Sequence, residues 1–253
     1  MKVAVLVKQT PQLSEVTMSG DGPKWPGGAD VVNPFDEYAV EEAIRFKENY
    51  GATAVAVTYG GADVVSALRD VLALGIDEAV HIESDSYSAT DPQNTARVLA
   101  ACIKKLGDVD LVLTGKQACD DDSAMVAFAV AANLDWPQIG FVKKFDKVDD
   151  SKITAWRTTD SGYDVVETPF PAVCSVVKEI NEPRLPSLKG KMKARKAEIK
   201  KFSLADLDIE HDRTTEIKNI QTPPERSQGE ILQGESDEVV DKLIEKLKAD
   251  QLI

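Results

Sequence analysis

Histidine and cysteine are scarce in this chain of 253 residues. The two histidines, His81 and His211, lie far apart, and so do the three cysteines, Cys102, Cys119 and Cys174. This spacing offers neither a CxxC metal motif nor an even set of partners for a disulfide framework. We therefore do not expect a metal enzyme, a histidine-based triad or a disulfide-stabilised scaffold, and we expect a reducing, cytoplasmic setting.

Long apolar runs are also missing. No run of about 18 apolar residues is present, so the sequence predicts no membrane-spanning helix. The segment 1–8 has too few apolar residues between its lysines for a signal-peptide core and is typical of a strand. The net charge of −13 disfavours general binding to nucleic acid.

One segment departs from this acidic balance. Residues 184–201 hold eight basic residues and one acidic residue, Glu198. A basic segment on an acidic protein is either a solvated face or an element that docks a partner or binds an anion, and the sequence leaves both readings open.

The first 135 or so residues alternate β-branched runs with helical patterns. Strands are expected at 2–7, 53–58, 78–82 and 110–114, and helices at 34–49, 62–74, 92–106 and 121–133. For the first helix, Asn33 is a suitable cap and Pro34 suits the first turn. The alternation predicts a doubly wound α/β fold, Rossmann-like, in which a mainly parallel sheet has helices on both faces.

After Pro137 the pattern changes to short strands separated by turns, at 139–146, 153–157, 163–168 and 172–177. These predict an antiparallel hairpin added to the parallel sheet. Residues 181–201 have no core pattern and are expected to form a long exposed loop. We divide the chain into a nucleotide-binding domain, 1–202, and a C-terminal arm, 203–253, which is polar around Pro223-Pro224 and ends in an amphipathic helix at 237–252.

Four segments are expected to meet at the carboxyl ends of the parallel strands, where such sheets bind ligands. They are 6–8, 33–36, 58–61 and 115–123. In the last segment, Gly115 permits close approach of the backbone and a following helix start suits phosphate. The run Asp120-Asp121-Asp122 repels phosphate, but it also suits a helix cap or ribose hydroxyls. Neither GxGxxG nor a P-loop is present, so these residues indicate a nucleotide site without fixing its type.

Four separated motifs nevertheless resemble one family, in the family's order. They are Asn33 to Ala43 (NPFDEYAVEEA), Gly115 to Asp122 (GKQACDDD), Leu134 to Gln138 (LDWPQ) and Asn181 to Arg184 (NEPR). Together they resemble the beta subunit of electron transfer flavoproteins, and the similarity extends from Met1 to about Phe202. The arm is similar in character rather than residue by residue.

The resemblance implies a heterodimer in which an alpha subunit holds most of the redox-active FAD, the beta subunit buries a structural AMP, and the C-terminal arm wraps the alpha subunit. The positions that match the AMP site are Leu6, Asn33, Pro34, Phe35, Asp36, Tyr59, Gly115, Lys116, Gln117, Ala118, Cys119, Asp120, Asp121, Asp122, Ser123, Ala124, Met125 and Val126.

It also implies docking of acyl-CoA dehydrogenases, from which electrons pass to a quinone-reducing electron transfer flavoprotein oxidoreductase. The docking positions are an anchor leucine, Leu188, and its basic neighbours Lys189, Lys191, Lys193, Arg195 and Lys196. An apolar anchor among mobile charges suits fast and reversible docking.

One difference from the family's pattern leaves the identity of the bound nucleotide open. Many family members continue the aspartate loop with Asn-Gln-Thr, whereas this chain has Ser123-Ala124-Met125-Val126. The basic segment and the arm look closer to members from anaerobes, some of which bind a second FAD in place of AMP and bifurcate electrons from NADH. A stand-alone nucleotide-binding regulatory module of similar architecture is a third reading.

Overall fold

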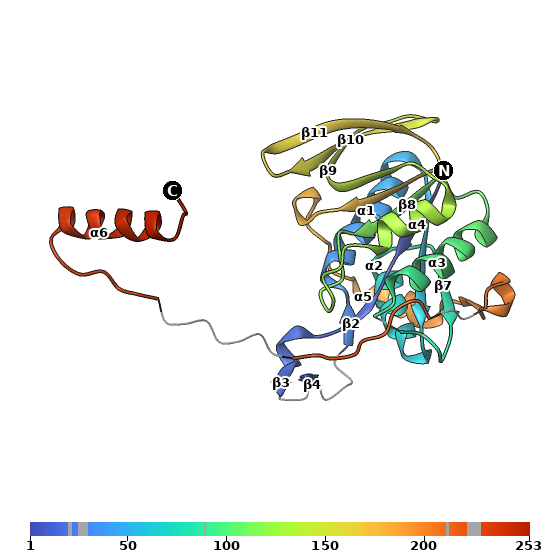
Figure 1. Ribbon diagram of the computed structural model, residues 1–253. Coiled ribbons are helices and arrows are strands. Elements are labelled where there is room, and N and C mark those ends of the chain that lie inside the picture. The colour runs from blue at the N-terminus through green and yellow to red at the C-terminus, as the bar shows by residue number, and fades with distance from the viewer. Residues whose placement is uncertain (20–21, 25–29, 89, 211–212, 222–228) are drawn as a thin grey trace.

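The computed structural model describes residues 1–19, 22–24, 30–88, 90–210, 213–221 and 229–253. Its centre is a nine-stranded sheet in the order β11-β10-β9-β12-β8-β1-β6-β7-β13 (Figure 1). The strands are β1 (Lys2–Leu6), β6 (Thr53–Gly60), β7 (Glu78–Glu83), β8 (Leu111–Gly115), β9 (Gln138–Val148), β10 (Lys152–Thr159), β11 (Gly162–Pro169), β12 (Ala172–Val176) and β13 (Ile199–Phe202). The helices are α1 (Pro34–Tyr50), α2 (Val65–Leu74), α3 (Pro92–Leu106), α4 (Val126–Leu134), α5 (Leu188–Lys196) and α6 (Ser236–Ala249).

The winding of the chain confirms the doubly wound prediction. Strand β1 pairs in parallel with β6 on one side and with β8 on the other. From β1 the chain moves outward through β6 to β7, and then returns to β8 and β12 on the opposite side of β1. The order therefore reverses between β1 and β8, and this is the position where open α/β sheets bind ligands.

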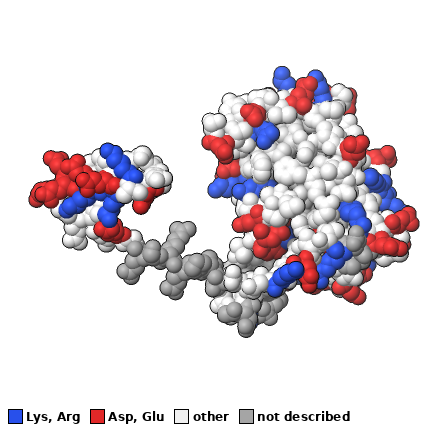
Figure 2. Space-filling model, in the orientation of Figure 1, with Lys and Arg blue, Asp and Glu red and all other residues white. Residues whose placement is uncertain are grey.

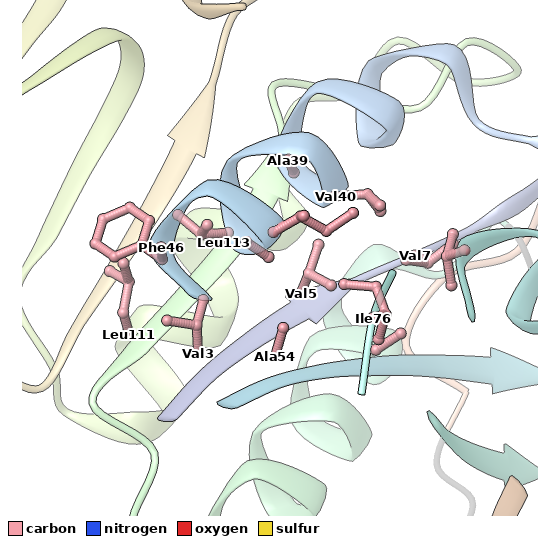
Figure 3. Close-up of a cluster of buried hydrophobic side chains, with 14 of the residues drawn as sticks. Val3, Val5, Val7, Ala39, Val40, Phe46, Ala54, Ile76, Leu111 and Leu113 are labelled. Atoms are coloured by element: carbon pink, nitrogen blue, oxygen red, sulfur yellow. The ribbon is translucent and has the colours of Figure 1, made fainter. Parts of the chain in front are cut away.

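Alternate residues of the strands point to two apolar layers, because the side-chain period of a strand is two. On β1, Val3 and Val5 belong to the layer under α1 and α2, whereas Ala4 and Leu6 belong to the layer under α3 and α4. Figure 3 shows the first layer, in which Phe46 of α1 lies over the strands. Burial on both faces explains why these strands are continuous apolar runs in the sequence.

Two predicted elements need correction. The fourth helix begins at Val126 rather than at 121, and residues between it and β8 form a loop in which Asp122 and Ala124 have φ angles of 50° and 52°. A right-handed helix cannot contain these left-handed residues. The expected exposed loop at 181–201 was also wrong, since it contains α5 and β13, and β13 pairs in parallel with β7 at the sheet edge.

Helix α5 is packed closely on α2. A Cβ at Gly190 would lie 2.2 Å from the carbonyl oxygen of Ala73, so only glycine allows this approach. Ala194 is 3% exposed, and Arg69 of α2 donates to the carbonyl oxygens of Ala194 and Ala197. The basic segment is therefore a fixed helix on the surface of the domain.

Strands β9, β10 and β11 form the antiparallel extension that the sequence predicted, although β12 pairs in parallel with both β8 and β9. Four short strands between β1 and α1 were not predicted. They form the pairs β2 (Gln9–Pro11) with β5 (Asp30–Val32), and β3 (Thr17–Ser19) with β4 (Gly22–Lys24).

The C-terminal arm leaves the domain, and α6 lies apart from the sheet (Figure 1). No residue of α6 is buried, and Val240, Leu243 and Ile244 are exposed on it. His211 and Pro223-Pro224 lie outside the described residues. Among the helices that the structure describes, none is long and apolar enough to cross a membrane.

Residues 181–184 join the start of the basic segment to α1. Arg184 contacts Glu41 through Nε at 2.8 Å and Nη2 at 3.0 Å, and it contacts Glu48 through Nη1 at 2.6 Å. Asn181 donates to the carbonyl oxygen of Tyr38 at 2.9 Å. Although burial alone raises the pKa of Glu41, the hydrogen bonds and charge of Arg184 hold it below its usual range.

We predict that Arg184→Met lowers the free energy of unfolding by about 2 kcal/mol, because the variant leaves the buried Glu41 without its main partner. Urea denaturation at neutral pH measures the change. The matched control is Lys152→Met, which breaks the exposed pair with Glu167 and is expected to cost less than about 1 kcal/mol. Equal losses in the two variants would contradict the prediction.

Candidate nucleotide-binding site

A pocket of about 700 Å³, part of it open to solvent, lies where the strand order reverses. It is bounded by the carboxyl ends of β1, β6 and β8, the start of α4 and the first turns of α3. The lining residues are Leu6, Val7, Lys8, Asn33, Asp36, Tyr59, Tyr87, Pro92, Thr95, Leu99, Thr114, Gly115, Lys116, Gln117, Ala118, Asp121, Ser123, Ala124, Met125, Val126 and Ala127.

The floor of the pocket depends on Asp36, in the first turn of α1. Its Oδ2 accepts the backbone N–H of Lys8 at 2.8 Å, just beyond β1, and its Oδ1 accepts the backbone N–H of Gly115 at 3.2 Å, at the end of β8. A Cβ at Gly115 would lie 2.6 Å from both Oδ1 of Asp36 and the carbonyl carbon of Phe35. Gly115 is therefore needed so that α1 can approach β8 this closely.

Asn33 fixes the loop after β8 instead of capping α1 with its side chain, which corrects the role that we predicted for it. Its Nδ2 donates to the carbonyl oxygen of Gln117 at 2.8 Å, and its Oδ1 accepts the backbone N–H of Cys119 at 3.1 Å. Asn33 is 1% exposed, so these bonds satisfy a buried amide.

The three aspartates of the loop have separate partners. Asp120 pairs with Lys8 at 2.7 Å, Asp121 accepts the hydroxyl of Ser123 at 3.2 Å, and Asp122 accepts the side-chain amide of Gln117. None of them caps α4, contrary to one of our readings of the sequence. The hydroxyl of Ser123 is already committed to Asp121, so backbone groups are the main donors that the loop offers to a ligand.

One side of the pocket is aromatic and aliphatic. Tyr59, at the end of β6, packs edge-on against Tyr87, with ring centroids 5.0 Å apart at 79°. Leu6 and Leu99 complete this wall. Burial raises the pKa of Tyr87, and the carboxylates of Asp120 and Asp121 raise it further, so its hydroxyl stays protonated. Burial raises the pKa of the Tyr59 hydroxyl, which interacts with the side chains of Ser84 and Asn94.

The pocket is also lined by the amino end of α4. Met125 makes no side-chain cap, and the first turn of α4 holds no acidic residue. The backbone N–H groups of a helix start carry partial positive charge, so Val126 and Ala127 present this end of the helix to the pocket. A pocket that combines an apolar wall with anion-binding backbone groups suits a flat base joined to a phosphate.

Of the eighteen predicted nucleotide-binding positions, the structure places thirteen on the pocket wall. The five others, Pro34, Phe35, Cys119, Asp120 and Asp122, lie behind it. Phe35 lies under Lys116, whose Nζ is 5.1 Å from the ring centroid. Cys119 donates to the hydroxyl of Thr10 at 3.4 Å.

Tyr87 and the α3 residues Pro92, Thr95 and Leu99 line the pocket but were not predicted from the sequence. They belong to the segment after β7, where no motif marks the pocket. Only the place of this loop in the fold could have indicated these residues, because the loop also leaves the carboxyl end of a parallel strand.

The predicted docking residues lie away from this pocket, on α5. Leu188 is 78% exposed, and its basic neighbours form the outer side of the helix. Two further apolar residues that we had not selected, Leu185 and Met192, are exposed beside it, at 90% and 60%.

The buried carboxyl of Asp36 leads to a prediction about pH. Burial raises its pKa to about 7, although the backbone N–H groups of Lys8 and Gly115 oppose the shift, whereas its ordinary value is 3.8. Between these values the folded chain holds a proton that the unfolded chain has lost. The contribution of Asp36 to stability therefore falls as the pH rises from about 4 to about 7.

We predict that Asp36→Asn removes this dependence. Between about pH 4 and pH 7.5 the unfolding free energy of the wild type, relative to that of the variant, should fall by roughly 2–4 kcal/mol. Urea denaturation at the two pH values measures it, with Asp164→Asn on exposed β11 as the control for losing one carboxyl. A relative rise for the wild type would sink the prediction.

Comparison with known proteins identifies the family of this chain. Residues 27–207 match the family described as electron transfer flavoprotein domain. An electron transfer flavoprotein subunit beta from Bacillus subtilis is 36% identical over 255 residues, which cover 99% of this chain and 98% of the relative. One from Thermoanaerobacterium thermosaccharolyticum is 33% identical over the whole of both chains, and so is the caffeyl-CoA reductase-Etf complex subunit CarD from Acetobacterium woodii. The chain therefore belongs to the electron transfer flavoprotein family, as a beta subunit.

Proposed function

We propose that this chain works as the nucleotide-binding half of a heterodimeric electron carrier. It binds a structural AMP, helps an alpha subunit to hold FAD, receives electrons through docked acyl-CoA dehydrogenases and delivers them to a quinone-reducing oxidoreductase. The observation that carries the proposal is the pocket at the strand reversal, which is lined by both an aromatic pair and the uncapped amino end of α4.

The pocket's chemistry supports an adenine nucleotide. Tyr59, Tyr87 and Leu99 provide the apolar surface that a base requires, and the α4 start provides the donors that a phosphate requires. In the described part of the chain, no arrangement of nucleophile and base that suggests covalent catalysis lines the pocket. A ligand held in this way stabilises the folded subunit by mass action.

A second candidate function is favoured by the loop Ser123–Val126. Because Asp121 already accepts the Ser123 hydroxyl, the loop lacks free side-chain donors for a terminal phosphate. The pocket is also open to solvent, which leaves room for a ligand longer than AMP. In this alternative a second FAD replaces AMP and the heterodimer bifurcates electrons from NADH. Since α6 exposes an apolar stripe that needs a partner, the third reading, a stand-alone module, has less support.

The surface of α5 supports a transient contact with a dehydrogenase. Leu188 projects from a helix that is fixed on α2, and Lys189, Lys191, Lys193 and Lys196 surround it. Exposed positive charges accelerate the encounter with an acidic partner, while one apolar anchor gives limited affinity. The exposed stripe on α6 suits the role of an arm that reaches the alpha subunit.

The experiment that tests the function is a count of nucleotides in the heterodimer purified after co-expression with the alpha subunit. Denaturation followed by chromatography should release one FAD and one AMP per heterodimer. Two FAD without AMP would support the bifurcating alternative. A heterodimer without flavin or adenine nucleotide would overturn both.

We predict that Leu188→Ala lowers the rate of electron transfer from an acyl-CoA dehydrogenase about tenfold, since it removes the exposed anchor. Replacing both Lys193 and Lys196 with Glu should slow association and weaken its dependence on salt. Stopped-flow reduction of the flavin measures both effects. Val240→Ala on α6 is the control that removes an exposed apolar side chain elsewhere. Unchanged rates in the Leu188 variant, with flavin content intact, would refute the anchor role.

A further inference from the structure

The sequence of α5 does not favour a helix by itself. The helix has nine residues, Leu188–Lys196, whereas isolated helices shorter than about 12–15 residues are marginal in water. It also contains Gly190, and a glycine inside a helix costs about 1 kcal/mol relative to alanine. The formation of α5 therefore depends on contacts with the rest of the domain.

The charges of α5 add a second cost. On the face of the domain that Figure 2 shows, acidic and basic side chains are interspersed, whereas α5 holds five basic residues and no acidic one. Three pairs of them recur at spacings of three or four, namely Lys189 with Lys193, Lys191 with Arg195, and Lys193 with Lys196. Like charges at these spacings repel each other on a helix surface and destabilise it.

The two sides of α5 have different tasks. Gly190 and Ala194 lie four residues apart and face the domain, since a Cβ at Gly190 would touch α2 and Ala194 is 3% exposed. Leu188 and Met192 each lie two residues before these positions, which is about 200° around the helix. They are 78% and 60% exposed. The small residues therefore seat the helix, and this seating sets the direction in which the apolar pair points.

Each end of α5 is held by a side chain. At the start, Ser187 accepts the backbone N–H of Gly190 at 3.0 Å. At the other end, Nη1 of Arg69 donates to the carbonyl oxygens of Ala194 and Ala197. The last carbonyl groups of a helix lack i+4 partners and carry partial negative charge, so a guanidinium suits them. Because Arg69 belongs to α2, this contact ties the carboxyl end of α5 to the domain.

The segment around α5 is attached to the domain on both sides without Arg69. Before the helix, Arg184 is bound to Glu41 and Glu48 of α1. After the helix, β13 pairs with β7 at the edge of the sheet. Loss of the Arg69 contact would leave both attachments in place. What Arg69 adds is the order of the helix between them.

We propose that Arg69 is a positioning residue for the docking of the dehydrogenase. Through the carbonyl oxygens of Ala194 and Ala197 it keeps α5 formed in the free carrier, so that Leu188 and Met192 already point outward before the partner arrives. An anchor that is ordered in advance loses less conformational entropy on binding than a mobile one. The inference rests on the proposed function, which supplies the dehydrogenase, and it adds Met192 to the anchor.

The test uses Arg69→Met in the heterodimer, which is assayed as the varied substrate of an acyl-CoA dehydrogenase. We expect the KM for the heterodimer to rise about fivefold while kcat stays unchanged, because the same complex forms but the helix must first be ordered. Arg69→Lys keeps the charge without the planar fork and should recover part of the loss.

The matched control is Arg213→Met. Arg213 donates to the carbonyl oxygen of Thr215 at 3.0 Å, so this variant also removes a guanidinium from a backbone carbonyl, but away from α5. It should leave the KM unchanged. A second comparison combines Arg69→Met with Leu188→Ala. In that background Arg69→Met should raise the KM by less than about twofold, because the anchor that Arg69 positions is already gone.

Hydrogen exchange of the heterodimer measures the order of α5 without the dehydrogenase. In Arg69→Met the amides of α5 should exchange at least about tenfold faster, while those of β7 and β13 keep their protection. This pattern separates a positioning role from general destabilisation, which would accelerate exchange across the sheet as well.

Three results would overturn the inference while leaving the proposed function intact. They are an unchanged KM in Arg69→Met, a full effect of Arg69→Met in the Leu188→Ala background, and exchange that is equally faster in β7 and β13. Full recovery by Arg69→Lys together with unchanged exchange in α5 would also overturn it, since charge alone would then explain the KM. A wild-type heterodimer that acyl-CoA dehydrogenases do not reduce refutes the proposed function itself.

Discussion

The geometry of the site depends on the carboxyl group of Asp36. It accepts backbone N–H groups from the ends of two adjacent parallel strands while belonging to the helix that starts between them. Because the chain leaves β1 and β8 in different directions, the loops beyond them separate, and the space between them becomes the pocket. Asp36 fixes how far they separate, and the absence of a side chain at Gly115 allows the helix to come near enough for the bond to form.

Much of the fold could be predicted because its strands are buried on both faces. A strand such as β8, with every residue buried, is a short apolar run that the sequence displays directly. Helix α5 gave no such signal, since Ala194 is its only buried residue. Its other contacts with α2 involve its backbone, because Gly190 lies close to the carbonyl oxygen of Ala73 and the Arg69 side chain donates to the carbonyl oxygens of Ala194 and Ala197. Burial of one alanine produces no periodicity, so the segment resembled a loop.

Only part of the candidate site could be predicted from the sequence. The motifs located its floor and one wall, because they contain Asn33, Asp36 and Gly115, whose hydrogen bonds join the start of α1 to the end of β8 and the loop beyond it. Asn33 was nevertheless assigned the wrong partner, since a cap requires only local sequence whereas its bonds to Gln117 and Cys119 cross more than eighty positions. Tyr87 was not predicted for the same reason, because its contact with Tyr59 depends on how the loop after β7 lies against the end of β6.

Asp91, at the start of α3, connects the nucleotide pocket to the C-terminal arm. Asp91 caps α3 by accepting the backbone N–H of Asn94 at 3.0 Å, and the same carboxylate accepts the backbone N–H of Thr214 at 2.7 Å. The next residue of α3, Pro92, lines the pocket. A ligand that contacts the first turn of α3 therefore stabilises the residues that hold the root of the arm, because it binds only when that turn is formed. A nucleotide bound as proposed would therefore favour the conformation in which Asp91 holds Thr214 of the arm.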